Sequence, residues 1–71
     1  MIDKEEAKDF IEIALNRLEK SVVEKDSALI RTSGQEFKNL ISDYGRIIGK
    51  ENIKNYSANY KNIMKKGEPL K

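Results

Sequence analysis

The sequence predicts an all-α fold, a small antiparallel three-helix bundle. Apolar residues recur at spacings of three and four through most of the 71 residues, which is the period of an amphipathic helix. Capping residues or glycines separate three such runs. The one segment that could form a strand, 29–32, would have no second strand to pair with. Because a chain of this length forms one domain, we expect residues 1–71 to fold as a single helical domain.

The first helix is predicted over about residues 4–25. Asp3 is followed three residues later by Glu6, an acidic variant of the capping box that starts a helix. The residues of its apolar face follow one another at helical spacing: Ala7, Phe10, Ile11, Ala14, Leu15, Leu18 and Val22. On the opposite, solvated side we expect two ion pairs between residues four apart, Lys8 with Glu12 and Lys20 with Glu24.

The second helix is predicted over about residues 34–48. Ser33 and Glu36 have the spacing of a capping box directly before a new apolar run. An earlier start is also open, because Asp26 and Ser27 could cap a turn that continues into this helix. Its apolar stripe comprises Phe37, Leu40, Ile41, Tyr44, Ile47 and Ile48. Gly49 is a natural residue for the end of the helix.

The third helix is predicted over about residues 51–65. Its apolar stripe comprises Ile53, Tyr56, Tyr60, Ile63 and Met64. Gly67 can close it, and residues 67–71 form a frayed tail.

A core in a chain this short stabilises the fold by only about 3–5 kcal/mol. Small domains usually add disulfides, a metal or a partner chain. The sequence has no cysteine and no histidine, which excludes disulfides and ordinary zinc sites. We therefore expect either a homodimer or a monomer that is steadied by a partner. No apolar run is long enough to span a membrane, and the acidic start is unlike a signal peptide, so we expect the protein in the cytoplasm.

The composition argues against an enzyme. Without histidine and cysteine, the commonest general bases and nucleophiles are missing. Glu5, Asp9 and Glu12 share one face of the first helix and could in principle hold a magnesium ion. A solvated acidic face at a helix N-terminus is the simpler interpretation. We therefore expect no catalytic residue, no metal site and no cofactor.

Charge is unevenly distributed along the chain. Residues 1–44 include seven basic and ten acidic residues, whereas residues 45–71 include seven basic and two acidic residues. A basic end of this kind is typical of a surface for nucleic acid or for an acidic protein. Asparagines at 52, 55, 59 and 62 could read bases, and Tyr56 or Tyr60 could stack on them, although both tyrosines lie on the apolar stripe. The candidates for nucleic-acid binding are Arg46, Lys50, Lys54, Asn55, Lys61, Asn62, Lys65 and Lys66.

A helix-turn-helix motif is not established by residues 44–50. The residue that follows the turn glycine in that motif should be apolar, and here it is Lys50.

The run Glu36-Phe37-Lys38-Asn39-Leu40-Ile41-Ser42-Asp43-Tyr44 resembles the second helix of the small aspartyl-phosphate phosphatases of sporulating bacteria. Ile11, Glu12 and Leu18 are similar to the first helix of that family, so the resemblance covers Ile11 to Tyr44. It implies a helical hairpin that docks on a response regulator. The motif of that family is Ser-Gln-Glu-Leu-Asp, followed by Leu-Ile and then Tyr. Gly34 stands where the motif has serine, and Lys38 where it has the aspartate needed for activity. The resemblance therefore implies binding without dephosphorylation.

We expect a protein-binding module, a regulator or inhibitor of a larger protein that a phage or mobile element could encode. Nucleic-acid binding through the third helix is the alternative. The basic side of the third helix and apolar residues outside the core would form the protein-binding surface. The candidates for that surface are Leu29, Ile30, Lys54, Lys61 and Lys65.

Overall fold

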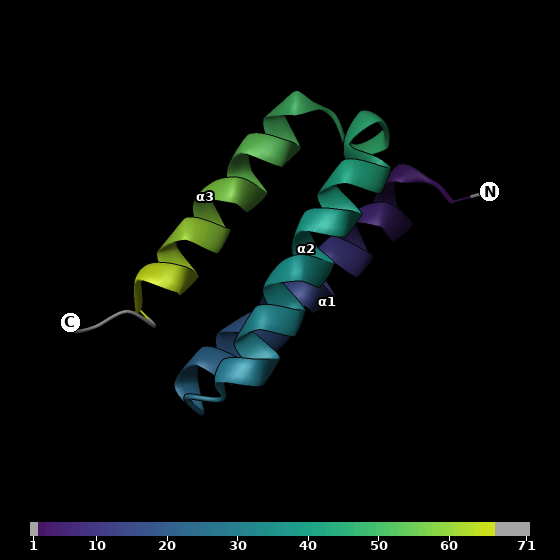
Figure 1. Cartoon of the computed structure of the whole chain (residues 1–71). Helices are drawn as coiled ribbons and strands as arrows, with labels where there is room; N and C mark the ends of the chain where they lie inside the picture. Colours follow the sequence, from purple (N-terminus) through teal and green to yellow (C-terminus); the bar gives the residue numbers. More distant parts are fainter. Residues whose placement is uncertain (1, 67–71) are drawn as a thin grey trace.

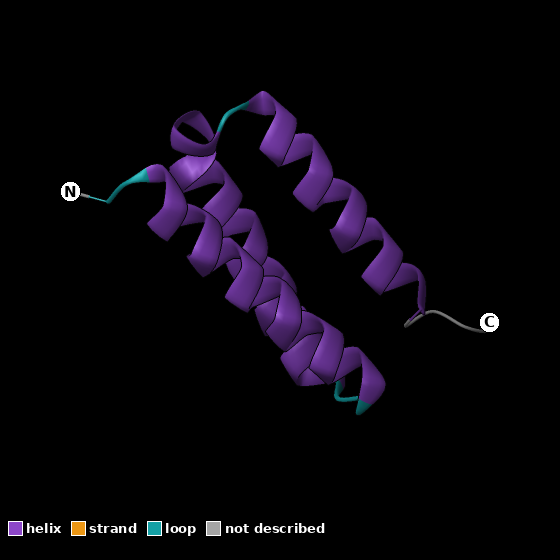
Figure 2. Cartoon of the chain, turned by 180° about the vertical axis from the view of Figure 1, so that it is seen from behind, coloured by secondary structure: helices purple, strands orange, loops and turns teal. Residues whose placement is uncertain are grey.

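The computed structural model describes residues 2–66 and contains three helices: α1 (Lys4–Val23), α2 (Ser27–Ile48) and α3 (Lys50–Lys66). Successive helices run antiparallel, and α1 and α2 form a hairpin alongside which α3 returns (Figure 1). The reverse view shows α1 and α2 close together, with α3 on one side of the pair (Figure 2). The predicted all-α three-helix bundle is confirmed. The predicted tail 67–71, including Gly67 as a helix end, lies outside the described residues.

Both ends of α1 have the hydrogen bonds of a capped helix. The Asp3 carboxylate accepts a bond from the Glu6 N–H at 2.9 Å, and the Glu6 carboxylate accepts one from the Asp3 N–H at 3.3 Å. At the other end, the N–H groups of Lys25 and Asp26 donate to carbonyls of the last turn at 3.1 and 3.0 Å. This closure requires Lys25 to adopt a left-handed conformation, with φ of 57°. The predicted capping box is confirmed.

The helix α2 begins seven residues earlier than the capping pattern at Ser33 predicts. Asp26 is the residue that caps it: its side chain accepts the Leu29 N–H at 3.1 Å. Ser33 is 1% exposed in the middle of α2, where its hydroxyl has no hydrogen-bond partner among the described residues. The main prediction of a start near Gly34 is therefore wrong, and the earlier start is correct.

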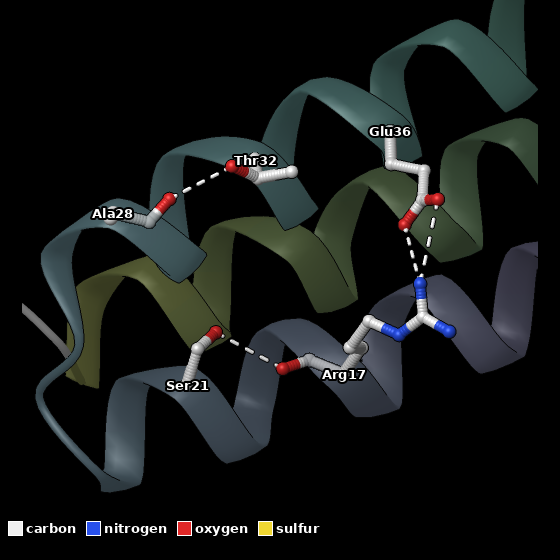
Figure 3. A network of polar contacts seen from close by, with 5 residues as sticks. All are labelled: Arg17, Ser21, Ala28, Thr32 and Glu36. Carbon is white, nitrogen blue, oxygen red and sulfur yellow. Dashed lines mark hydrogen bonds and ion pairs between the residues drawn. The ribbon is translucent and has the colours of Figure 1, made fainter.

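The segment 29–32 is helical. Thr32 donates a hydrogen bond from its hydroxyl to the Ala28 carbonyl one turn earlier, at 3.0 Å (Figure 3). Leu29 and Ile30 are both half-buried, and Ile30 packs against the core. Burial of Ile30 gives a physical reason for the earlier start, since a helix from Ser27 adds one more apolar residue to the packed face.

A single residue joins α2 to α3. Gly49 has φ of 90° and ψ of 157°, a conformation that is essentially restricted to glycine. Its N–H donates to the Gly45 carbonyl at 3.0 Å, and its carbonyl accepts the Ile53 N–H at 3.1 Å. Asn52 also donates from its side chain to the Ile48 carbonyl at 2.6 Å. Gly49 thus ends one helix and starts the next, which confirms the prediction that it is the residue at the end of the second helix.

The core contains most of the predicted apolar stripes. Its buried residues come from all three helices: Ala7, Ile11, Ala14, Leu15, Leu18, Val22, Phe37, Ile48, Tyr56 and Ile63. Two members of the predicted stripes are not buried: the side chains of Phe10 and Ile47 are 44% and 39% exposed. A bundle of only three helices buries a narrower stripe on each helix than the sequence pattern offers.

Two glycines of α2 mark where α3 packs. A Cβ atom on Gly34 would lie 3.5 Å from the Tyr60 hydroxyl oxygen, and one on Gly45 would lie 3.1 Å from the Ile53 Cδ1. The Tyr60 ring also stacks on Phe37, with ring centroids 4.9 Å apart. These contacts determine which side of α3 faces α2.

The predicted ion pairs within α1 are not formed. Among residues 2–66, carboxylates lie within 4.0 Å of a basic group in two pairs, Arg17 with Glu36 and Lys66 with Glu19. Both pairs join different helices. Exposed pairs four residues apart are worth only a few tenths of a kcal/mol, so contacts between helices easily outweigh them.

Candidate functional site

The side of α3 that faces α1 is lined with amides and faces carboxylates. A groove of about 440 Å³ runs between the two helices, and Asn59, Asn62 and Lys66 of α3 line it opposite Glu12 and Glu19 of α1. The Lys66 Nζ lies 3.7 Å from the Glu19 Oε2. An acidic wall of this kind repels phosphate groups. The groove is therefore unsuited to nucleic acid.

Tyr56 also lines this groove. Its hydroxyl donates a hydrogen bond to the Glu12 Oε2 at 2.9 Å, and the residue is 7% exposed. The pKa of the Tyr56 hydroxyl is raised to about 12, mainly by burial, then by the hydrogen bond to Glu12 and by the charges of Glu12, Glu5 and Asp9. Tyr56 is therefore a neutral hydrogen-bond donor at physiological pH.

Lysines lie on the opposite side of α3. Ile53 and Tyr60 touch α2, and Lys54 and Lys61 each follow one of them directly. One residue turns a helix by about 100°, so both lysines point outward beyond the contact with α2. Asn59 precedes Tyr60 and is turned the other way, toward α1. The lysines and the asparagines of α3 thus face different neighbours.

The adjoining surface of α2 is also basic. The Lys38 Nζ lies 5.8 Å from the centre of the Tyr60 ring, and Arg31 is two helical turns before Lys38 on the same side. Arg46 and Lys50 line one hollow where α2 meets α3. We call this set of cations the basic face: Arg31, Lys38, Arg46, Lys50, Lys54, Lys61 and Lys65.

The basic face has little compensating charge. No carboxylate of residues 2–66 lies within 4.0 Å of any of its seven cations. Of the acidic residues of α2, Glu36 is bound to Arg17 of α1 at 3.1 Å. Asp43 is three residues before Arg46, but the two side chains do not form an ion pair within 4.0 Å. In α3 the one acidic residue is Glu51, in the first turn, where the helix dipole favours it.

The predicted nucleic-acid candidates are thus divided between two surfaces. Five of them belong to the basic face, whereas Asn62 and Lys66 line the groove beside α1, and Asn55 is two turns before Asn62 on that side. Tyr56 and Tyr60 are engaged by Glu12 and Phe37 and do not offer free rings to bases. Sequence reasoning missed Arg31 and Lys38, although their seven-residue spacing on one side of α2 could have indicated them.

The predicted protein-binding candidates are also divided. Lys54, Lys61 and Lys65 belong to the basic face, whereas Leu29 and Ile30 lie in the first turn of α2. Ile30 is partly covered because it packs against the core.

The outer side of α1 is apolar at its centre. Phe10 and Ile13 are 44% and 52% exposed, and together with Leu40 of α2 they line a hollow of about 230 Å³. The Phe10 ring lies against Tyr44, with centroids 6.3 Å apart. Arg17 borders the hollow and is bound to Glu36 (Figure 3). The sequence interpretation placed Phe10 in the core and did not single out Ile13.

No family model, curated protein or solved structure matches the chain. The resemblance to the aspartyl-phosphate phosphatases stays a prediction, and at its motif positions the Glu36 carboxylate is bound to Arg17 while Lys38 lies over Tyr60.

Two further properties of the described residues bear on function. Within residues 2–66 no group of three or more acidic side chains is arranged to hold a metal ion, and this includes Glu5, Asp9 and Glu12. None of the helices in the described part of the chain has a stretch long and apolar enough to cross a lipid bilayer.

Proposed function

We propose that the protein is a non-enzymatic, cytoplasmic binding module that docks its basic face on an acidic surface of a larger protein and thereby regulates or inhibits that protein. The observation that carries this proposal is the convergence of seven cations from α2 and α3 on one side of the bundle, without a carboxylate of residues 2–66 within 4.0 Å. Uncompensated charge of one sign speeds association with a surface of opposite charge and selects against basic partners.

Nucleic acid is the second candidate for the same surface, because phosphates would also be attracted to the basic face. Two features favour the acidic protein. The asparagines that could read base edges, Asn59 and Asn62, line the groove beside α1, and the rings of Tyr56 and Tyr60 are engaged within the fold. What remains on the basic face is charge, which suits a carboxylate-rich protein surface without any need for base recognition.

The test is affinity capture from a lysate of the cells that carry the gene, with and without nuclease. Lys54→Glu/Lys61→Glu reverses two charges in the centre of the basic face. Lys4→Glu/Lys25→Glu makes the same change in net charge at exposed positions outside it. We expect one protein to be captured in both nuclease conditions by the wild type and by the control variant, and to be lost with Lys54→Glu/Lys61→Glu.

Two outcomes would contradict the proposal. Capture that disappears on nuclease treatment would identify nucleic acid as the ligand. Capture that Lys54→Glu/Lys61→Glu leaves unchanged would show that the basic face is not the docking surface. Circular dichroism on all variants establishes that each retains its helices.

A further inference from the structure

A second stripe of α1 is exposed along the edge of its contact with α2. Glu6, Phe10, Ile13, Arg17 and Lys20 follow one another at spacings of four, three, four and three, which places them on one side of the helix. All five are exposed. We call them the outer stripe. Its alternating spacing is that of a seam along which two helices pack.

The apolar centre of the outer stripe is held in place by α2. Phe10 is supported by the Tyr44 ring at 6.3 Å, and Arg17 by two contacts to the Glu36 carboxylate at 3.1 and 3.5 Å. Side chains that are already ordered lose less conformational entropy on binding. Ile13 is 52% exposed between them.

The charges of the outer stripe are complementary to a reversed copy of the same stripe. Glu6 is seven residues before Ile13 and Lys20 is seven residues after it, so each lies about 10 Å from Ile13 along the axis. When two α1 helices are placed antiparallel with Ile13 facing Ile13, each Glu6 faces a Lys20 of the other copy. A parallel arrangement would instead oppose Glu6 to Glu6 and Lys20 to Lys20.

We propose that the protein forms an antiparallel homodimer along the outer stripe of α1, with Ile13 at the two-fold axis. The interface is isologous, because each copy contributes the same residues to it. It covers the exposed Phe10 and Ile13 and adds apolar burial to a small core. The basic face belongs to α2 and α3, so it stays accessible in both copies. This proposal is independent of the proposed function.

The first experiment is analytical ultracentrifugation over a protein concentration range of about 10 µM to about 1 mM, which brackets the affinity of so short an interface. We expect the mass to rise with concentration from 8.2 kDa toward twice that value. Ile13→Lys places two like charges at the two-fold axis and removes two apolar contacts, so it should weaken dimerisation about 100-fold or more.

Val23→Lys is the matched control. Val23 is also β-branched and is 74% exposed on α1, but it lies about 80° around the helix and about 15 Å along it from Ile13 at the two-fold axis. It should dimerise as the wild type does. Both substitutions are at exposed positions, and circular dichroism should show that both variants keep their helices.

Two further sets of variants test the orientation. Lys20→Glu places like charges opposite each other and should weaken the dimer roughly two- to tenfold, and Glu6→Lys/Lys20→Glu should restore most of the loss. The chain has no cysteine, so Ile13→Cys should form a disulfide-linked dimer on mild oxidation, while Val23→Cys should form no disulfide-linked dimer at the same concentration.

The proposal is overturned by a wild type that stays at 8.2 kDa over the whole concentration range, or by dimerisation that Ile13→Lys leaves unchanged. A monomeric wild type whose captured protein is lost with Ile13→Lys would assign the outer stripe to a different partner. None of these results depends on whether Lys54→Glu/Lys61→Glu loses its ligand, so the two proposals fail separately.

Discussion

Replacing Ser33 with alanine should make the protein more stable. Ser33 is 1% exposed in the middle of α2, and its hydroxyl has no hydrogen-bond partner among the described residues. If α2 began at Gly34 instead, Ser33 would cap the helix and the same substitution would cost about 1 kcal/mol. The two descriptions of α2 thus predict opposite signs for one substitution.

The expected gain follows from two contributions. A buried polar group without a partner costs about 1–3 kcal/mol, and alanine is favoured over serine within a helix by about 0.5 kcal/mol. Loss of packing around the removed oxygen of Ser33 offsets part of this gain. We expect the free energy of unfolding to rise by about 1–2 kcal/mol, and the Tm of a domain of this size to rise by about 4–8 °C for each kcal/mol.

Urea and thermal unfolding followed by circular dichroism measure this change. Ser21→Ala is the matched control, because Ser21 is 0% exposed but its hydroxyl donates to the carbonyls of Leu18 at 2.8 Å and Arg17 at 3.0 Å. Its removal loses satisfied bonds and should not stabilise the protein. A Ser33→Ala variant that unfolds about 1 kcal/mol more easily than the wild type would refute the continuous helix.

Three other predictions concern the turns, the packing of α3 and the groove. Gly49→Ala should lower the free energy of unfolding measured in urea by about 1–3 kcal/mol, because φ is 90° there. Lys25→Gly should raise the same free energy by about 1 kcal/mol, because glycine adopts the φ of 57° without strain. A neutral effect of either substitution would contradict the turn geometry. Gly34→Ala should raise it by about 0.5–1 kcal/mol in the same assay, since the new Cβ would meet the Tyr60 hydroxyl at an ordinary 3.5 Å, and a loss would mean that α3 packs more closely. The pKa of Tyr56 is raised from 10.0 to about 12 in the folded protein, so the folded state holds the hydroxyl proton more tightly than the unfolded state does. The protonated Tyr56 therefore adds to the free energy of unfolding; this addition is complete below pH 10 and is lost as the pH rises through 12. Ultraviolet absorbance should show a tyrosine ionisation near pH 12 that Tyr56→Phe removes. A wild type without this ionisation near pH 12 would contradict the bond to Glu12.

Several features of the fold follow from the sequence alone because they depend on neighbouring residues. Asp3 and Glu6 cap α1 through bonds between positions three apart. Gly49 ends α2 because few other residues adopt its conformation. The three apolar stripes have the period of a helix whatever they pack against. These local relations were sufficient to predict an all-α three-helix bundle.

The start of α2 depended on tertiary structure. The spacing of Ser33 and Glu36 is that of a capping box, but the same two residues fit equally well within a helix, with Ser33 buried and Glu36 bound to Arg17 of α1. Only the packing of Ile30 against the core and the cap at Asp26 distinguish a helix that starts at Ser27 from one that starts at Gly34. A local pattern can show that a helix is able to start at a residue, but neighbouring helices decide whether it does.

Tertiary structure also decided what each side of a helix faces. The sequence alone places the lysines and asparagines of α3 on adjacent parts of one polar surface. The contact of Tyr60 with Gly34 and the bond from Tyr56 to Glu12 turn the lysines away from α1 and the asparagines toward its carboxylates. Phe10 similarly lies at the edge of the apolar face of α1, and a third helix on the other side of the hairpin leaves it exposed. Periodicity determines the angle between side chains within one helix, whereas the directions of the other helices, and so the composition of each surface, arise only when the helices pack.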